Sequence, residues 1–295
     1  EVIHSGSHML DDAIGIWGIP RGRLVQYAGK ESSGKTLMSL LAIAEWQKLG
    51  EENWAAYVDA EFALDELWAQ KLGVDLSRLF IIRENDGVTI FDELCGIPHK
   101  ELGKPKVKEG ILDLVKEYPG LGIIVIDSIA SIIPPITATK EVGNTNIAPM
   151  GRFLPDALTR LIPLLSQTNV TCICINQVRV DVGKMYGDPT TTPGGKALKH
   201  NNSVMVHFTT SESKESFLYE PDGKTIEGHI VGVRIDKNKL APPRRECKFK
   251  IKYLSGVVEK HIEIADLAIK YKIVERPNKM TYIYNGKSYK GAKNL

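Results

Sequence analysis

The stretch at residues 29–36, GKESSGKT, constrains the fold of this chain more than any other segment. It follows an apolar run, LVQYAG at 24–29, and precedes a segment over 37–49 whose leucines repeat with helical spacing. A GxxxxGK[ST] loop between a strand and a helix is the arrangement of a P-loop. Its backbone N–H groups and the helix N-terminus bind phosphate oxygens. The pattern therefore predicts an α/β fold with a nucleotide phosphate site.

Within this loop, Lys35 is expected to reach the β- and γ-phosphates, and Thr36 is expected to ligate Mg²⁺. ATP and Mg²⁺ are therefore the expected cofactors. The alternative is a chance glycine-rich turn, which would not account for the strand–loop–helix context. The remaining members of the expected phosphate cradle are Gly29, Ser32, Ser33 and Gly34.

Strands and helices alternate after the P-loop. Near-continuous Ile and Val runs indicate parallel strands that are covered on both faces. These strands are expected at 54–61, 79–85, 123–128 and 172–177. Helices are expected at 62–73, up to about Tyr118 and around 151–166. In the last helix Pro155 fits a first turn, whereas Pro163 predicts a kink or an end.

After Asn202 the pattern changes to period-two alternation, which predicts strands that extend the sheet in antiparallel fashion. These strands are expected at VMVHFTT (204–210), HIVGVRID (229–236), ECKFKIKYL (246–254) and VVEKHIEI (257–264). A helix at 265–274 and a hairpin around Asn285-Gly286 follow. We expect a core over 1–235, then residues 236–295, which lead into a small C-terminal domain beginning at about 255–265.

Composition excludes some classes of protein. The chain has 295 residues, 43% hydrophobic and 25% charged, which is typical of a globular protein. Its net charge is +2, so any contact with nucleic acid must come from local patches. No apolar run approaches the roughly 20 residues that span a bilayer, and no membrane partner is expected. The four cysteines, which form no CxxC pair, are expected to be buried thiols in a cytosolic protein: Cys95, Cys172, Cys174 and Cys247.

Carboxylates end two of the predicted strands. Asp127 closes IIVID, which is the position of a Walker B carboxylate that holds Mg²⁺. Glu61 closes YVDAE and is the expected catalytic carboxylate that orients water, with Asp59 deeper on the same strand face. Alternatively, Asp127 caps the next turn, and Asp59 and Glu61 are ordinary polar groups at a strand end.

These motifs, in this order, resemble the bacterial and phage RecA recombinases, and the resemblance covers almost the whole chain. MYGDPTTTPGGKALK and KNKLAPP are specific to recombinases, whereas a P-loop alone occurs in many NTPases. The other matching segments are Ser5-Gly6-Ser7, Leu10-Asp11, DAEFALDELWAQKLGVD, IIVIDSIAS and INQVR.

The resemblance implies a RecA-type P-loop ATPase core, with a mostly parallel sheet flanked by helices, plus a small α+β C-terminal domain. It implies a helical homo-oligomer that forms on single-stranded DNA with ATP and Mg²⁺. This filament would pair the strand with homologous double-stranded DNA and exchange strands. The setting would be the bacterial cytoplasm, or that of an infected host for a phage protein.

The resemblance also implies two DNA-binding loops. In the first, at about 141–152, Ile147 would insert at base steps and Arg152 would contact phosphate. The second, at about 178–200, would use charge, close backbone approach and an apolar contact. Its expected DNA-binding residues are Arg179, Met185, Gly194, Gly195, Lys196 and Lys199. On chemistry alone, the second loop could equally be a mobile surface loop.

Further roles follow from the resemblance. Gln177 would sense the γ-phosphate, and Glu31 would sense the neighbouring protomer. Asp65 and Trp68 would contact adenine.

Lys237 and Lys239, two apart and so on one face of a strand, would reach the neighbour's γ-phosphate and assist catalysis. A solvated sheet edge is the alternative for this pair.

Departures from the family pattern favour a phage or divergent member. Compared with the family pattern, the chain is expected to start after the N-terminal docking helix and to lack the acidic C-terminal tail. Lys30 replaces a proline, His200 replaces a phenylalanine, and the segments at 97–118 and 211–227 are longer. Two rivals remain. A ring-forming RecA-fold helicase should lack the recombinase motifs. A regulatory paralogue often loses a catalytic carboxylate or a loop, and this chain retains both.

Overall fold

The computed structural model describes residues 1–97, 110–135, 149–180, 190–191, 195–211, 213–278, 280–291 and 294. Two expected DNA contacts in the second loop, Met185 and Gly194, lie outside the described residues, as does Ile147 in the first. Of Arg179, Gly195 and Lys196, the structure describes the backbone alone.

The core of the protein is a mixed sheet with the order β14-β13-β12-β10-β3-β7-β6-β4-β5, to which β11 adds by pairing with β12. Its parallel part consists of β3 (Leu24–Gly29), β4 (Trp54–Asp59), β5 (Leu79–Ile82), β6 (Leu121–Asp127), β7 (Thr171–Gln177) and β10 (Val204–Thr210). Its antiparallel part consists of β11 (Phe217–Tyr219), β12 (Ile226–Asn238), β13 (Glu246–Lys252) and β14 (Gly256–Val258). The expected antiparallel extension of a parallel sheet is confirmed.

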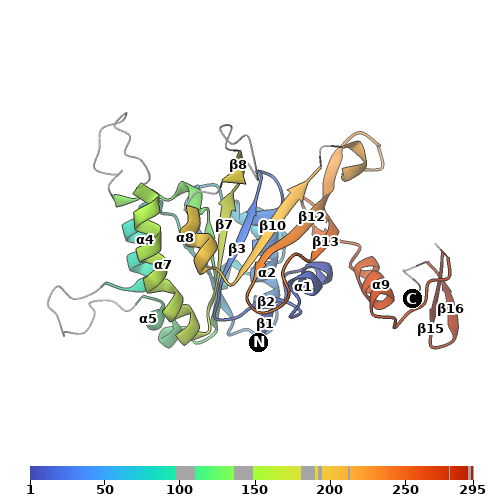
Figure 1. Ribbon diagram of the computed structural model, residues 1–295, viewed down its shortest axis with the longest axis horizontal. Helices are drawn as coiled ribbons and strands as arrows, with labels where there is room; N and C mark the ends of the chain where they lie inside the picture. The colour runs from blue at the N-terminus through green and yellow to red at the C-terminus, as the bar shows by residue number, and fades with distance from the viewer. Residues whose placement is uncertain are drawn as a thin grey trace.

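Side-chain alternation along the central strands builds two cores. In β6, Val125 packs with α1 (His8–Ile14) and α2 (Lys35–Gln47), whereas Ile124 and Ile126 pack with the helices on the opposite face. Those helices are α4 (Gly87–Cys95), α5 (Ile111–Glu117) and α7 (Pro149–Thr168). Because successive strand side chains point to opposite faces, a continuous apolar run is what a two-sided sheet requires. Figure 1 shows α4 and α7 on one side of the sheet and α1 on the other.

Short elements complete the described chain. A first small pair joins β1 (Val2–Ile3) with β2 (Ile19–Pro20), and a second joins β8 (Arg179–Val180) with β9 (Thr190–Thr191). Two further short helices are α3 (Glu66–Lys71) and α8 (Gly195–Asn201), and 3-10 turns lie at Leu76–Arg78, Ile129–Ser131 and Lys214–Ser216. No helix in the described part of the chain is long and apolar enough to cross a bilayer.

The C-terminal segment forms a unit with its own small core. It contains α9 (Lys260–Lys270) and the hairpin of β15 (Thr281–Tyr284) and β16 (Lys287–Lys290), which pack around Ala265, Val274 and Tyr282. The expected hairpin at Asn285-Gly286 is confirmed, and Figure 1 places this unit at the end of the molecule far from α4 and α5. The expected division at residue 235 stays a prediction, and β12 continues unbroken across it.

One expected strand is wrong, and one of two alternatives for an expected helix is excluded. The strand expected at 257–264 stops at Val258, and Glu259, with a φ of 59°, turns the chain into α9. The helix expected around 151–166 is not ended by Pro163, because α7 continues to Thr168. A proline removes one backbone hydrogen bond, and the buried side chains of Leu161 and Leu165 hold the helix against the sheet on either side of it.

Candidate nucleotide site

The P-loop connects β3 to α2 as expected, and its shape depends on two glycines. A Cβ on Gly29 would lie 2.5 Å from the Phe208 carbonyl oxygen, so this position has room for glycine alone. Gly34 has a φ of 91° and caps the start of α2 in a left-handed conformation. The backbone therefore curls at the helix N-terminus, where N–H groups are free to bind phosphate.

Lys35 lies folded into this loop. Its ammonium group donates to the carbonyl oxygen of Lys30 at 2.6 Å and to the Ser33 hydroxyl at 3.3 Å. The side chain is buried, and burial lowers its pKa, while Asp127, Glu61 and Glu31 act in the opposite direction. The cation thus points into the hollow of the loop, where a phosphate group would replace the carbonyl oxygen as its partner.

Thr36 and Asp127, the expected Mg²⁺ ligands, are in direct contact. The Thr36 hydroxyl donates to Asp127 Oδ2 at 2.7 Å, and the Tyr57 hydroxyl donates to the same oxygen at 2.7 Å. Burial raises the pKa of Asp127, whereas these two hydrogen bonds oppose the increase. A hydroxyl oxygen and a carboxylate oxygen side by side fit the preference of Mg²⁺ for oxygen ligands. Tyr57 was not identified from the sequence, although it lies two residues before Asp59 on the same strand.

Glu61 lies at the centre of a polar cluster. It follows the end of β4 by two residues instead of closing the strand as expected. Its Oε1 accepts from the Ser128 hydroxyl at 2.5 Å, from Ser131 at 3.3 Å and from Gln177 Nε2 at 3.4 Å. The strand order explains the contact with Gln177, because β4, β6, β7 and β3 are adjacent and their carboxyl ends meet at one edge.

The neighbouring carboxylate, Asp59, has a different environment. It is buried, and its two oxygens accept from the backbone N–H groups of Ala63 and Leu64 at 3.0 and 3.1 Å. Asp59 therefore holds the turn after β4, which favours the structural alternative for this residue. Glu61 is the carboxylate that lies with Gln177.

A cavity of about 420 Å³ opens beside the P-loop. Trp68 lines it, and the Trp68 indole donates to the Tyr253 carbonyl oxygen at 2.6 Å. The other expected adenine contact, Asp65, caps α3 by accepting from the Trp68 backbone at 3.0 Å. The cavity is lined by Ser32, Ser33, Gly34, Lys35, Thr36, Leu37, Trp68, His229, Ile251 and Tyr253.

Three lining residues, His229, Ile251 and Tyr253, were missed from the sequence. They come from β12, β13 and the turn after β13, and His229 is paired with Ile251 in the sheet register. The His229 Nδ1 atom lies 3.3 Å from the Tyr253 hydroxyl, and its Nε2 atom is buried without a hydrogen-bond partner. Burial lowers the pKa of His229. No local motif marks these residues, because the pairing of β12 with β13 brings them to the P-loop.

The two expected interface lysines differ in environment. The Lys237 ammonium group donates to the carbonyl oxygens of Lys199 and His200 at 2.7 Å each, at the end of α8. Burial lowers the pKa of Lys237, and Lys239 and Lys199 lower it further. Lys239 is exposed and lies just beyond the end of β12, so only Lys237 of the two belongs to the strand.

The remaining expected residues lie on the surface or near the loops. Glu31 is exposed on the P-loop, Arg152 is exposed on α7, and Lys199 is exposed on α8. All four cysteines are buried free thiols, as expected. This burial agrees with the expectation that the cysteines pack as small apolar residues.

The chain matches known proteins along most of its length. The model of the RecA N-terminal domain matches residues 1–258. The chain is 37% identical over 276 residues to Protein RecA of Ruminococcus albus, covering 94% of this chain and 63% of that protein. Protein RecA of Staphylococcus carnosus is 38% identical over 284 residues, with coverage of 96% and 72%. Protein RecA of Heliobacterium modesticaldum is 37% identical over 286 residues, with coverage of 97% and 75%.

The chain thus spans less than two thirds of the R. albus relative and about three quarters of the H. modesticaldum relative. The family model alone covers residues 1–258, which include the P-loop, Glu61, Asp127, Gln177 and both expected lysines. The chain belongs to the RecA family.

Proposed function

We propose that the chain is a DNA-dependent ATPase that assembles as a helical filament on single-stranded DNA. With ATP and Mg²⁺ it pairs that strand with homologous double-stranded DNA and exchanges the strands, in recombination and repair. The observation that supports this most is the contact between Gln177 and Glu61. It joins the expected catalytic carboxylate to the strand that leads into the second expected DNA-binding loop.

Different residues of the site bind the phosphates, hold Mg²⁺, orient water and contact the adenine. Lys35 and the loop N–H groups bind the phosphates, and Thr36 with Asp127 holds Mg²⁺, which offsets phosphate charge when bound. Glu61 orients the attacking water, and its bonds to Ser128 and Ser131 keep the carboxylate in place. Trp68 and Tyr253 form the walls for the adenine, where aromatic surface favours stacking.

Gln177 acts as the sensor between nucleotide and DNA. Its backbone is adjacent to Gly29 of the P-loop in the sheet register, and its amide reaches Glu61. An amide both donates and accepts, so it can exchange the carboxylate for a γ-phosphate oxygen. That exchange would shift the backbone at Arg179 and hence the position of the second loop.

The neighbouring protomer completes the site through Lys237 and Lys239. In the single chain the Lys237 ammonium group donates to carbonyl oxygens at the end of α8, which forms the C-terminal part of the second expected loop. Reaching a neighbour's γ-phosphate therefore requires Lys237 to release those carbonyl oxygens. We infer that filament assembly and the placement of α8 are linked through this one side chain. DNA contacts by Arg152, Lys199 and the residues of the two loops would then be largely to phosphates.

The test is ATP hydrolysis by the full chain with Mg²⁺, with and without single-stranded DNA, over a range of protein concentrations. The proposal predicts strong stimulation by DNA and a steep rise in specific activity with concentration, because neighbours complete each site. A rate that is independent of both DNA and concentration would contradict it and would favour a regulatory paralogue or a different motor.

A further inference from the structure

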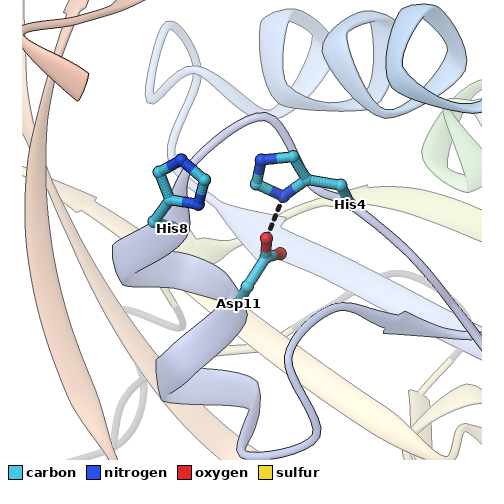
Figure 2. Close-up of side chains that lie close together, drawn as sticks. All are labelled: His4, His8 and Asp11. Atoms are coloured by element: carbon cyan, nitrogen blue, oxygen red, sulfur yellow. Dashed lines mark hydrogen bonds and ion pairs between the residues drawn. The ribbon is translucent and has the colours of Figure 1, made fainter. Parts of the chain in front are cut away.

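A second cluster of chemically capable side chains lies away from the nucleotide site, at the turn between β1 and α1. It consists of His4, His8 and Asp11, which Figure 2 shows converging on one point. His4 Nδ1 is hydrogen-bonded to Asp11 Oδ2, and the His8 ring stacks on the His4 ring with centroids 4.8 Å apart. One ligand atom from each of the three residues lies within 4.8 Å of the others.

The local fold holds these groups together. His8 and Asp11 are three residues apart on α1, so they share one helix face. Gly6, with a φ of 94°, lets the chain turn so that His4 lies over that face. A Cβ on Gly6 would come within 2.9 Å of Leu41 Cβ, so the turn is packed tightly against α2.

Asp11 is positioned as a ligand would be. It is buried, and its Oδ1 accepts from the Ser5 backbone N–H at 3.0 Å, which leaves Oδ2 directed at His4. Within the described residues its carboxylate forms no ion pair with a lysine or an arginine. A hydrogen bond to the distal oxygen of a ligating carboxylate is the usual way in which proteins fix such a group.

We propose that His4, His8 and Asp11 form a binding site for a divalent transition metal of the Zn²⁺ class. Two imidazole nitrogens and one carboxylate oxygen are the donors that Zn²⁺ prefers, and water would fill the remaining position. Mg²⁺ prefers oxygen donors throughout and so belongs at Thr36 and Asp127 instead. On binding, the metal replaces the hydrogen bond between His4 and Asp11.

The geometry needs two adjustments. Zn–N and Zn–O bonds of about 2.0–2.2 Å place tetrahedral donor atoms roughly 3.4 Å from one another. The hydrogen-bonded pair of His4 Nδ1 and Asp11 Oδ2 must therefore move apart, and the His8 nitrogen must take its place at the same distance from both. His8 is half-buried on the first turn of the helix, so rotation about its side-chain bonds would carry a ring nitrogen toward Asp11. Glu45 and Lys260 are the charged groups beyond the cluster that act on His4, and their charges oppose each other.

The bound metal would stiffen the contact between the core and the C-terminal unit. The His8 backbone N–H and the Ser7 hydroxyl both donate to the Glu263 carboxylate of α9, at 2.8 and 2.9 Å. A metal held by His4 and His8 would fix this turn in the conformation that Glu263 binds. The site is therefore structural, and it is independent of ATP hydrolysis.

The test uses the full chain without an affinity tag and with millimolar Mg²⁺ present throughout. Zn²⁺ affinity is measured by competition with a chromophoric chelator, and Co²⁺ is the spectroscopic probe. The parent should bind one equivalent of Zn²⁺ and give Co²⁺ visible bands of a four- or five-coordinate site. His8→Ala should weaken Zn²⁺ binding by more than about tenfold, as should His4→Ala.

His261→Ala is the matched control, because His261 is half-buried on α9 and lies outside the cluster. It should retain the parent's affinity and Co²⁺ spectrum. Zn²⁺ should also raise the Tm of the parent and of His261→Ala, but not that of His8→Ala. A parent that binds no Zn²⁺ at micromolar concentrations, or three variants that bind it equally, would overturn the proposal.

Discussion

At the candidate nucleotide site, single residues carry buried charges that a bound ligand would compensate better than the protein alone does. Lys35 is a buried cation that points at a carbonyl oxygen, and Asp127 is a buried anion held by two hydroxyl groups. Burial of a charge costs free energy unless it is paired. Both side chains therefore weaken the ligand-free protein, and they are strong candidates for binding phosphate and Mg²⁺.

Lys35→Ala should lower the rate of ATP turnover by about 100-fold or more, because a charge-assisted contact to the transferring phosphate is lost. The measurement is steady-state ATP hydrolysis with single-stranded DNA. Lys30→Ala is the control, because Lys30 is exposed and contacts Lys35 through its carbonyl oxygen alone. Equal rates for Lys35→Ala and the parent would remove Lys35 from the phosphate site.

Asp127→Asn should stabilise the ligand-free protein and at the same time abolish its Mg²⁺-dependent activity. Without ligands it should raise the free energy of unfolding by about 0.5–2 kcal/mol, because a neutral amide replaces a buried charge and still bonds to Thr36 and Tyr57. Chemical denaturation measures this change, and the same variant should lose Mg²⁺-dependent hydrolysis. A variant that is less stable than the parent would show that the Asp127 carboxylate is compensated in the ligand-free protein.

Secondary-structure elements show which parts of the fold can be predicted from the sequence. The central strands were predictable because their apolar runs are buried on both faces, and the P-loop was predictable because its motif is local. The strand expected at 257–264 was wrong because Glu259 adopts a positive φ, which no sequence pattern indicates. His229 and Tyr253 were missed because the pairing of distant strands brings them to the P-loop.

Hydrogen bonds between side chains also stabilise the sheet, and the Asp236 carboxylate on β12 is an example. Asp236 accepts from His207 of β10 at 3.0 Å and from Arg234 at 2.5 Å. Burial alone would raise the pKa of Asp236, but these two hydrogen bonds lower it to about 2. A carboxyl group whose pKa is lowered by folding stabilises the folded state above its unfolded pKa.

Asp236→Asn should therefore lower the free energy of unfolding at pH 7 by about 1–2 kcal/mol, an amount reduced because the pair is partly exposed. The loss should shrink as the pH falls from about 4 towards about 2, where the parent's Asp236 also becomes protonated. Urea unfolding across this pH range tests the sign. A difference between variant and parent that grows towards low pH would contradict it.

At the scale of the whole molecule, α1 joins the sheet to the C-terminal unit. Glu263 of α9 accepts from Ser7, His8 and Met9 at the start of α1, and Asp12 is paired with Lys270 and Arg245. An anion at a helix N-terminus satisfies N–H groups that otherwise lack partners. The orientation of the C-terminal unit thus depends on a few buried polar contacts.

Glu263→Ala should lower the free energy of unfolding by about 1–3 kcal/mol, because buried donors at the start of α1 lose their acceptor. Hydrogen exchange should accelerate in α9 and in the hairpin of β15 and β16, while the central sheet stays protected. Asp266→Ala, which removes an exposed carboxylate from the same helix, is the control. Unchanged exchange in α9 would mean that other contacts position the C-terminal unit.

At the scale of the whole molecule, we propose that nucleotide binding controls the affinity for DNA through Gln177, whose amide contacts Glu61. The most direct test is the affinity for single-stranded DNA, with and without a non-hydrolysable ATP analogue, in the parent and in Gln177→Ala. The analogue should tighten DNA binding by the parent but not by Gln177→Ala, which should still bind the analogue itself. Equal enhancement of DNA affinity in both proteins would show that Gln177 does not link nucleotide binding to DNA binding.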